Sequence, residues 1–237
     1  MSQASPLRDV ARSERSERTY GGVSAAERTA VRRARFIEAG IAVFGGPGFR
    51  SATVRGVCNA AGLTDRYFYE SFDSLEALLT AVYGELMARL RTRMDEAARQ
   101  VAAGCDGLAP AQVLERHVMA GYEVWFDLVR DPAFARIVLA EVLGVSPAVD
   151  ALYEAGMQQF AELNSAAVAA ALPSGQLSAE RQQLVGRALI GAAVQVARLW
   201  MSSGWRESRD EVVRTCVLVT LGTLRALVAE AQAGAPR

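Results

Sequence analysis

The sequence predicts an all-α protein with a small N-terminal unit of three helices and a larger C-terminal helical bundle. Apolar residues recur at helical spacing along most of the chain, and no stretch alternates convincingly as a strand would. Prolines, glycines and capping residues divide the periodic stretches into separate helices. Of the 237 residues, 51% are hydrophobic, which is enough to bury a sizeable core.

Residues 1–23 are expected to form a flexible, Arg-rich arm. Ser, Arg and Glu alternate in this segment without any apolar periodicity. Its arginines could follow a DNA backbone or enter a minor groove, as arms of other DNA-binding folds do. The alternative is an inert tail, because acidic residues in the same segment partly cancel the charge. These arginines are Arg8, Arg12, Arg15 and Arg18.

A first long helix is expected from about Ser24, because Ser24 and Glu27 form a capping-box pattern. Its apolar stripe consists of Phe36, Ile37, Gly40, Ile41 and Phe44. Another face carries arginines that could contact phosphate, namely Arg28, Arg32 and Arg35. The GGPG run at 45–48 ends the helix. It is not a phosphate-binding loop, because the Lys-Ser/Thr pair and the preceding strand are both missing.

A helix-turn-helix is expected over residues 53–72. Thr53 can cap a first short helix with its hydroxyl, and Gly62 can end it because glycine enters the left-handed conformation at little cost. Thr64 would cap the second helix. Two phenylalanines four residues apart share one face of that second helix, which leaves Arg and Tyr side chains pointing outward. Such a helix is suited to enter the major groove of DNA.

Several sequence motifs follow one another in this region. A helix ends in Phe44 and glycines, and then come T-V-R, A-A-G-L-T, Y-F-Y-x-x-F and S-L-E-A-L-L. In this order they resemble the DNA-binding region of the tetracycline-repressor (TetR) family, from Arg33 to Tyr83. The resemblance covers roughly the first third of the chain. It implies a DNA-binding transcriptional regulator with its recognition helix at the Y-F-Y-x-x-F motif.

The resemblance also implies roles for individual residues. Tyr69 matches a residue that commonly binds backbone phosphate, and Thr53 and Arg55 match positions near phosphate. Four residues match the tip of the recognition helix, where bases are read: Thr64, Asp65, Arg66 and Tyr67. With Arg32 and Arg35 of the preceding long helix, these residues make up the expected DNA-binding set.

Two positions depart from the pattern of the family. Leu75 and Asp65 stand where many members have a lysine. An aspartate near phosphate is repulsive unless it accepts from cytosine or orients Arg66. The phosphate contacts must therefore depend on Arg55, Tyr69 and other arginines.

Charge and cysteine content narrow the classes of function. The net charge is zero, but residues 1–72 hold 11 Arg and 7 acidic residues, about +4, and the remainder holds 15 and 19, about −4. This excess lies at the helix-turn-helix end, although scatter could also produce it. Three cysteines and a single histidine provide no disulfide framework, zinc site or catalytic constellation, so we expect no cofactor, no metal and no enzyme activity.

The C-terminal region should contain only helices. A long helix capped by Asp73 or Ser74 is expected to run to about Ala103 and to connect the two regions, so that movement at its far end can displace the recognition helix. Further helices are predicted at about 110–130, 132–143, 147–172, 178–203 and 208–232. The expected domains are therefore 24–72 for DNA binding and 73–237 for ligand binding and dimerisation.

Aromatic and Met residues gather on the middle helices and could line a mostly apolar pocket with a few polar groups. The alternative for each of them is ordinary core packing, and the family resemblance favours the pocket. The candidate ligand-binding residues are His117, Tyr122, Trp125, Phe126, Tyr153, Met157, Phe160 and Gln195.

The last two helices carry small residues on apolar surfaces, a composition that close helix contact requires. The resemblance implies that they pair with their counterparts in a four-helix homodimer interface. The alternative is that they only cover their own core. The most apolar stretches, 188–201 and 212–228, are short or broken by polar residues, and the N-terminus lacks a secretory signal. We therefore expect a soluble, cytoplasmic protein without a membrane segment.

These observations predict a ligand-responsive regulator, specifically a repressor that binds a palindromic operator as a homodimer and is released by a small apolar effector. The first alternative is an architectural or partner-binding helical protein without sequence preference, which would show steep salt dependence but little discrimination between DNA sequences. An all-α enzyme is the other alternative, and no constellation of residues supports it.

Overall fold

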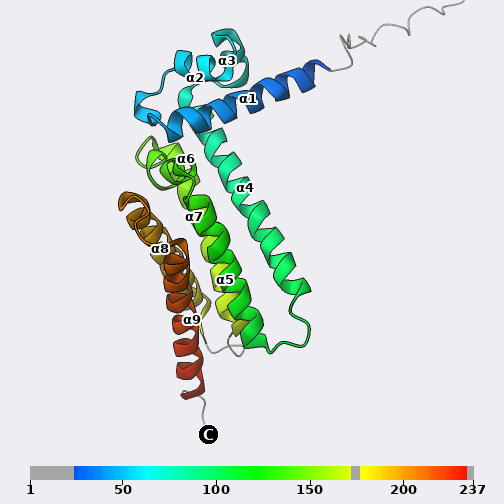
Figure 1. The fold of residues 1–237 in the computed structure, drawn as a ribbon, viewed down its shortest axis with the longest axis vertical. Coiled ribbons are helices and arrows are strands. Elements are labelled where there is room, and N and C mark those ends of the chain that lie inside the picture. Colours follow the sequence, from blue (N-terminus) through cyan, green and yellow to red (C-terminus); the bar gives the residue numbers. More distant parts are fainter. Residues whose placement is uncertain (1–23, 172–176, 234–237) are drawn as a thin grey trace, which may run out of the picture.

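The computed structural model describes residues 24–171 and 177–233, and every regular element in these ranges is helical (Figure 1). The all-α prediction is confirmed for this part of the chain. The expected Arg-rich arm at residues 1–23 lies outside the described residues.

Three helices form the N-terminal unit at one end of the molecule (Figure 1). They are α1 (Ala25–Gly45), α2 (Val54–Ala61) and α3 (Asp65–Ser71), with the short 3₁₀ turn η1 (Phe49–Ser51) between the first two. The expected capping box joins Ser24 and Glu27, and the Thr53 hydroxyl accepts from the Gly56 N–H. Gly62 ends α2 with φ +63°. Thr64 takes the N-cap position of α3, but its side chain makes no capping hydrogen bond, contrary to prediction.

The C-terminal region is a bundle, and the long helix α4 runs along one side of it from the N-terminal unit (Figure 1). Its helices are α4 (Leu75–Ala103), α5 (Pro110–Val129), α6 (Pro132–Arg136), α7 (Pro147–Ala171), α8 (Ala179–Ser202) and α9 (Arg209–Ala233). One prediction was wrong in detail, because 132–143 is not a single α-helix. After α6 the chain continues as the π-helical turn η2 (Ile137–Glu141).

An aromatic core holds the N-terminal unit together. Phe36 and Phe68 are fully buried, and their ring centroids lie 5.5 Å apart in an edge-to-face arrangement. Phe72 packs against both rings. Gly40 allows α1 to approach α4, because a Cβ at this position would lie 2.7 Å from the Val82 side chain. The short recognition helix is therefore fixed by rings on one side and leaves its other side exposed.

A second contact joins the two regions, and we call it the α1–α6 junction (Gly45–Phe49 with Ala133, Arg136 and Glu141). The Glu141 carboxylate accepts from the Phe49 N–H at 2.7 Å and from Arg136 Nε at 2.7 Å. Arg136 also donates to the Gly46 carbonyl. A Cβ on Gly45 would lie 2.4 Å from the Ala133 Cβ, so the backbones pack closely there.

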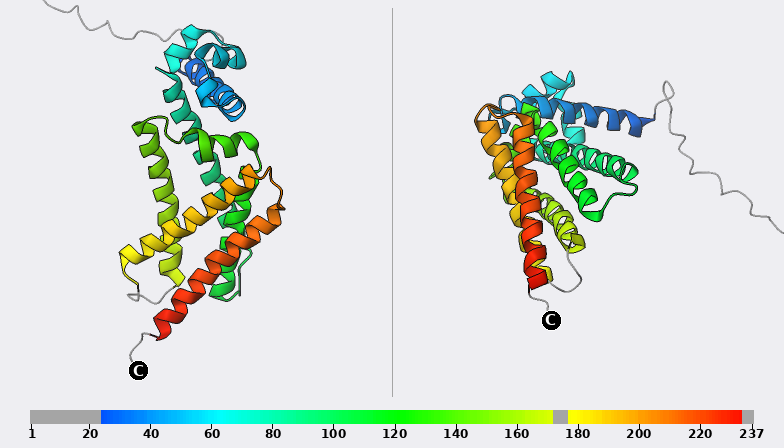
Figure 2. Two further views of the ribbon diagram at one scale, coloured as in Figure 1. Left: turned by 90° about the vertical axis from the view of Figure 1, so that its left-hand side faces the viewer. Right: turned by 60° about the horizontal axis from the view of Figure 1, so that its bottom comes forward.

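The last two helices lie on one face of the bundle (Figure 2). By length and composition alone, α8 and α9 could each cross a membrane, although polar residues interrupt them. This is weak evidence for a membrane segment, because core helices of soluble proteins share these properties. Large apolar side chains are exposed on both helices, namely Leu184, Leu199, Leu218 and Val219.

Candidate DNA-binding surface and ligand cavity

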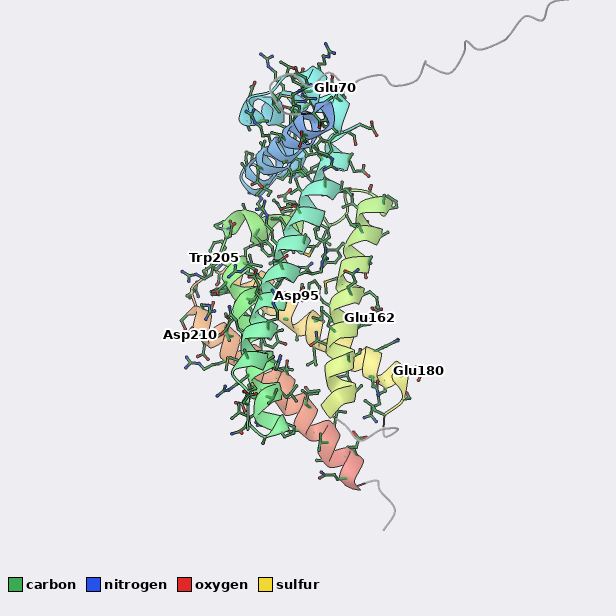
Figure 3. All side chains as sticks on the ribbon, turned by 90° about the vertical axis from the view of Figure 1, so that its right-hand side faces the viewer. Glu70, Asp95, Glu162, Glu180, Trp205 and Asp210 are labelled. Carbon is green, nitrogen blue, oxygen red and sulfur yellow. The ribbon has the colours of Figure 1, made fainter. Side chains whose placement is uncertain are left out.

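The exposed face of α3 is built on the aromatic core beneath it. Phe68 is fully buried, whereas 84% of the Arg66 side chain and 60% of Tyr69 are exposed. Helix α3, marked by Glu70 in Figure 3, lies at the end of the molecule farthest from the C-terminal bundle. The geometry fits a short helix that is held from one side and presents polar groups on the other.

Charged groups on this face are paired with one another. Glu70 accepts from Arg66 Nε at 3.1 Å and lies 3.7 Å from Arg32 Nη2. The Arg32 guanidinium stacks over the Tyr67 ring at 4.5 Å from its centroid. Arg66 is thus oriented by Glu70, and among the residues that the structure describes no ion pair joins it to Asp65.

The other residues of the expected DNA-binding set lie around this face. Arg55 and Thr64 are exposed, and Thr53 is occupied in capping α2. Arg35 donates to the Ala61 carbonyl at 2.7 Å and so ties α1 to the end of α2.

Asp65 lies beside a buried thiol of α2. Burial, with the Asp65 carboxylate as a smaller cause, raises the pKa of Cys58 to about 11. The carboxylate itself remains exposed at the tip of α3.

A cavity of about 290 Å³ lies between α4, α5, α7, α8, α9 and the π turn. Six of the eight predicted ligand-binding residues line it: His117, Tyr122, Trp125, Tyr153, Met157 and Phe160. Phe126 lies outside the cavity, fully buried against Trp200 at 5.7 Å between ring centroids. Gln195 is also outside, exposed in a separate groove between α7 and α8.

The sequence analysis missed the wall that α4 contributes. Tyr83, Met87, Leu90 and Met94 line the cavity, together with Val138 and Leu139 of the π turn and Asn164 of α7. The apolar stripe of α4 was visible in the sequence. Helical periodicity identifies a buried face but cannot distinguish a packed face from a cavity wall.

Most polar groups in the cavity wall are already hydrogen-bonded. The Tyr122 hydroxyl lies 2.7 Å from Thr220 Oγ1, and His117 Nδ1 lies 2.9 Å from the Val113 carbonyl. Burial raises the pKa of Tyr122 and raises that of Tyr83 to about 12, so both remain neutral phenols at ordinary pH. No Arg, Asp or Glu is present among the described residues that line the cavity.

Metal binding finds no support in this part of the chain. Within residues 24–171 and 177–233, no three His, Cys, Asp or Glu side chains gather where they could hold a metal ion. Cys58, Cys105 and Cys216 are all free thiols.

Residues 36–82 match the family described as bacterial regulatory proteins, tetR family. Among solved structures, the fatty acid degradation regulator FadR of Bacillus halodurans has a TM-score of 0.65 at 18% identity, covering 82% of this chain and 96% of that one. A tetR-family transcriptional regulator of Streptomyces coelicolor has a TM-score of 0.64 at 21% identity, covering 87% and 90%.

A third similar structure is the regulator FadR of Bacillus subtilis in complex with stearoyl-CoA. Its TM-score is 0.62 at 17% identity, and the alignment covers 82% of this chain and 97% of that one. At such identities the likeness shows a shared fold. No curated protein sequence is significantly similar to this chain.

Proposed function

Because this chain belongs to the tetR family of bacterial regulatory proteins, we propose that it is a transcriptional repressor released from DNA by a small, largely apolar effector. The observation that carries the proposal is the combination of an exposed, cationic and aromatic α3 face with an apolar cavity that α4 connects to it. The cytoplasmic location follows from the proposal, since the bacterial chromosome lies there.

The DNA-binding surface would be the expected set around α3. Arg66 is the single cation of α3, with its side chain 84% exposed, and would read a base edge, with Thr64, Asp65 and Tyr67 beside it. Tyr69 and Arg55 would bind phosphate, because both are exposed polar side chains on the two helices of the helix-turn-helix. Arg32 would contribute by holding Tyr67 in place.

A homodimer would form through α8 and α9. Leu184, Leu199 and Leu218 are 67%, 58% and 70% exposed, which is unfavourable for an apolar side chain in water. Small residues lie between them on the same helices, so a second copy could approach closely. A two-fold dimer would place two α3 helices in successive major grooves of a palindromic operator.

Two paths lead from the cavity to α3. The cavity wall contains Tyr83 and Met87 of α4, and α4 begins directly after α3. The wall also contains Val138 and Leu139, which share the π turn with Glu141 of the α1–α6 junction. An effector that favours another position of either segment would displace α3, with a coupling of about 1–3 kcal/mol. The similar FadR of Bacillus subtilis was solved in complex with stearoyl-CoA, whose long hydrocarbon chain supports an apolar portion of the effector, although its CoA portion is charged.

The test is selection of bound DNA from a random duplex pool by the purified full chain. We expect an inverted repeat, because a two-fold dimer with one helix-turn-helix per subunit reads two related half-sites. Recovery of a single half-site would contradict the dimer. A pool that stays random would contradict specific binding, provided that the protein was first unfolded and refolded to remove any effector carried through purification.

A further inference from the structure

The groove between α7 and α8 that contains Gln195 shares part of its wall with the cavity. We call it the α7–α8 groove. Four residues line both spaces: Tyr153, Met157, Ile190 and Val194. The side chain of Met157 is flexible, so its movement can connect the cavity with the groove.

The groove carries charged side chains, whereas no Arg, Asp or Glu lines the cavity in the described part of the chain. Arg187 and Arg198 of α8 line the groove together with Glu154 of α7. Within residues 24–171 and 177–233, neither arginine forms an ion pair with a carboxylate. Two unpaired cations therefore outnumber one carboxylate, and the groove favours an anion.

Arg198 lies at the border between the cavity and the groove. Its Nε donates to the Leu139 carbonyl at 3.2 Å and its Nη2 to the Tyr153 hydroxyl at 3.3 Å, and both of these partners line the cavity. The two bonds use two of the five N–H groups of the guanidinium and leave Nη1 without a partner. Protein atoms do not seal Nη1 off, because the buried side-chain nitrogens that lack a partner in the described residues are Arg32 Nε and Trp125 Nε1.

Arg198 is also a partly buried cation without a counter-ion. Two other arginines in the described part of α4 to α9 are partly buried, Arg136 and Arg209. Each of these two is ion-paired, Arg136 with Glu141 and Arg209 with Asp127. A cation that is partly removed from water without a compensating charge is unfavourable. An anion in the groove would supply the charge that Arg198 lacks.

The proposed dimer does not need to cover this groove. Leu199, one of the exposed residues of the proposed interface, follows Arg198 directly and therefore points about 100° further around α8. Helix α7 packs on another side of α8, where a Cβ on Gly186 would lie 2.5 Å from the Ala161 carbonyl oxygen. Arg198 lies between these two directions and faces the groove beside α7.

We propose that the effector is an amphiphile, a hydrocarbon chain that ends in a carboxylate, whose chain fills the cavity and whose carboxylate pairs with Arg198 in the α7–α8 groove. The inference rests on the proposed function in so far as it calls the bound molecule an effector. It adds to that function an anionic end, which the lining of the cavity alone does not predict, and a residue that selects for this end.

The test compares three probes of equal chain length by calorimetric titration of the full chain: octanoate, 1-octanol and octylammonium. We expect octanoate to bind about tenfold more tightly than 1-octanol, because only the carboxylate supplies a counter-ion for Arg198. Octylammonium should bind about tenfold more weakly than the alcohol, because its charge has the same sign as that of the arginine.

Arg198→Gln removes the charge and keeps an amide that can donate to the Leu139 carbonyl. In this variant octanoate should bind no more tightly than 1-octanol. The affinity for 1-octanol should stay as in the wild type and so report an intact cavity. Arg198→Lys restores the charge and should restore most of the preference for octanoate.

Arg187→Gln is the matched control, since it removes an arginine from the same groove. Arg187 lies about 16 Å from Arg198 along the axis of α8, too far for one carboxylate to bind both. Its Nε and Nη2 donate to Gln158 Oε1 at 3.2 and 3.0 Å. We expect this variant to change the preference for octanoate by less than about twofold.

Equal affinities for octanoate and 1-octanol in the wild type would overturn the proposal, and so would a preference that survives Arg198→Gln. An equal loss of preference in Arg187→Gln would replace the pairing with Arg198 by a general attraction of anions to the groove. Failure of all three probes to bind would overturn the placement of a hydrocarbon chain in the cavity.

DNA selection is independent of these titrations. A preference for octanoate without an operator would leave the inference about the groove standing and remove the proposed repressor. An operator without probe binding would do the reverse.

Discussion

In the part of the chain that the structure describes, the N-terminal unit and the C-terminal bundle differ in that only the bundle places some of its aromatic residues along a cavity. In the N-terminal unit, Phe36, Phe44 and Phe68 are fully buried in a packed core. In the bundle, Trp125 and Phe160 are only partly buried and line a cavity. The packed rings of the N-terminal unit hold the exposed face of α3 in place, whereas the rings of the bundle leave the cavity open. A ligand-controlled DNA-binding protein of the proposed kind requires both a well-packed N-terminal unit, which holds the exposed face of α3 in place, and a bundle with space for a ligand.

Helix α4 shows the same contrast within one element. Near its start, Leu78, Leu79 and Val82 are fully buried against the N-terminal unit. From Tyr83 onward, other side chains of the helix line the cavity, among them Met87. Methionine is flexible and fills irregular space, so this part of α4 can adapt to different occupants.

The largest expected effect tests the difference in packing directly. Phe68→Ala should lower the free energy of unfolding by about 3–5 kcal/mol, because it leaves a cavity in a fully packed site. Phe160→Ala removes the same atoms from a partly exposed cavity wall and should cost only about 1 kcal/mol. Chemical denaturation followed by circular dichroism measures both. Equal losses would mean that the two regions are packed alike.

Short-range patterns in the sequence were sufficient to predict most of the helix ends of the N-terminal unit. The capping box at Ser24, the Thr53 cap and the left-handed Gly62 all depend on residues within four positions of one another, and each is confirmed. Thr64 is the exception, because a residue with capping chemistry need not form the hydrogen bond. Apart from the 132–143 helix, the predicted helix boundaries of the bundle also agree with the structure to within about two residues, the usual uncertainty of helix ends.

Features that depend on distant contacts could not be predicted. Trp125 and Phe126 are adjacent and both apolar, yet one lines the cavity and the other packs against Trp200. The π turn that interrupts the predicted 132–143 helix ends at Glu141, whose partner Phe49 lies 92 residues earlier. A single-sequence pattern contains no information about such pairs. The roles of the predicted DNA-binding and ligand-binding residues remain predictions.

The α1–α6 junction joins the two regions. Loss of its hydrogen bonds should make the unfolding of the N-terminal unit less coupled to that of the bundle. Glu141→Ala leaves the Phe49 N–H and Arg136 without their shared acceptor and should cost about 1.5–3 kcal/mol. Glu141→Gln keeps an acceptor and should cost less. We expect the alanine variant to unfold in a broader transition, because the N-terminal unit loses a contact with the bundle. If both variants unfold like the wild type, α4 alone connects the regions.

Arg66→Ala tests whether the exposed face of α3 recognises the base sequence of DNA. The variant should lose about 1–3 kcal/mol of binding free energy on the selected operator and little on unrelated DNA, because a base contact carries the discrimination. Arg99→Ala is a suitable control, since Arg99 is exposed on the part of α4 that lies in the bundle. Fluorescence anisotropy at fixed salt concentration measures both variants. An equal loss on all sequences would make Arg66 a phosphate contact instead.

The smallest expected effect concerns the buried thiols, one in each region. Burial raises the pKa of Cys58 and of Cys216 to about 11 from an ordinary value of 9.0, while Cys105 is partly exposed. Because only the thiolate reacts readily, Ellman's reagent should modify Cys105 quickly in the native protein and the other two only after opening. The raised pKa values also mean that the stability present below the unfolded pKa declines as pH rises through about 9 to about 11.

The modification rates of the two buried thiols, Cys58 and Cys216, report separately on the opening of the N-terminal unit and of the bundle. Phe68→Ala should accelerate modification of Cys58, which packs in the same unit, and should leave the rate at Cys216 in α9 nearly unchanged. Mass spectrometry of the labelled peptides assigns each rate. Parallel acceleration at both cysteines would show that the two regions open as one cooperative unit, and the contrast between a rigid head and an adaptable bundle would then have to be abandoned.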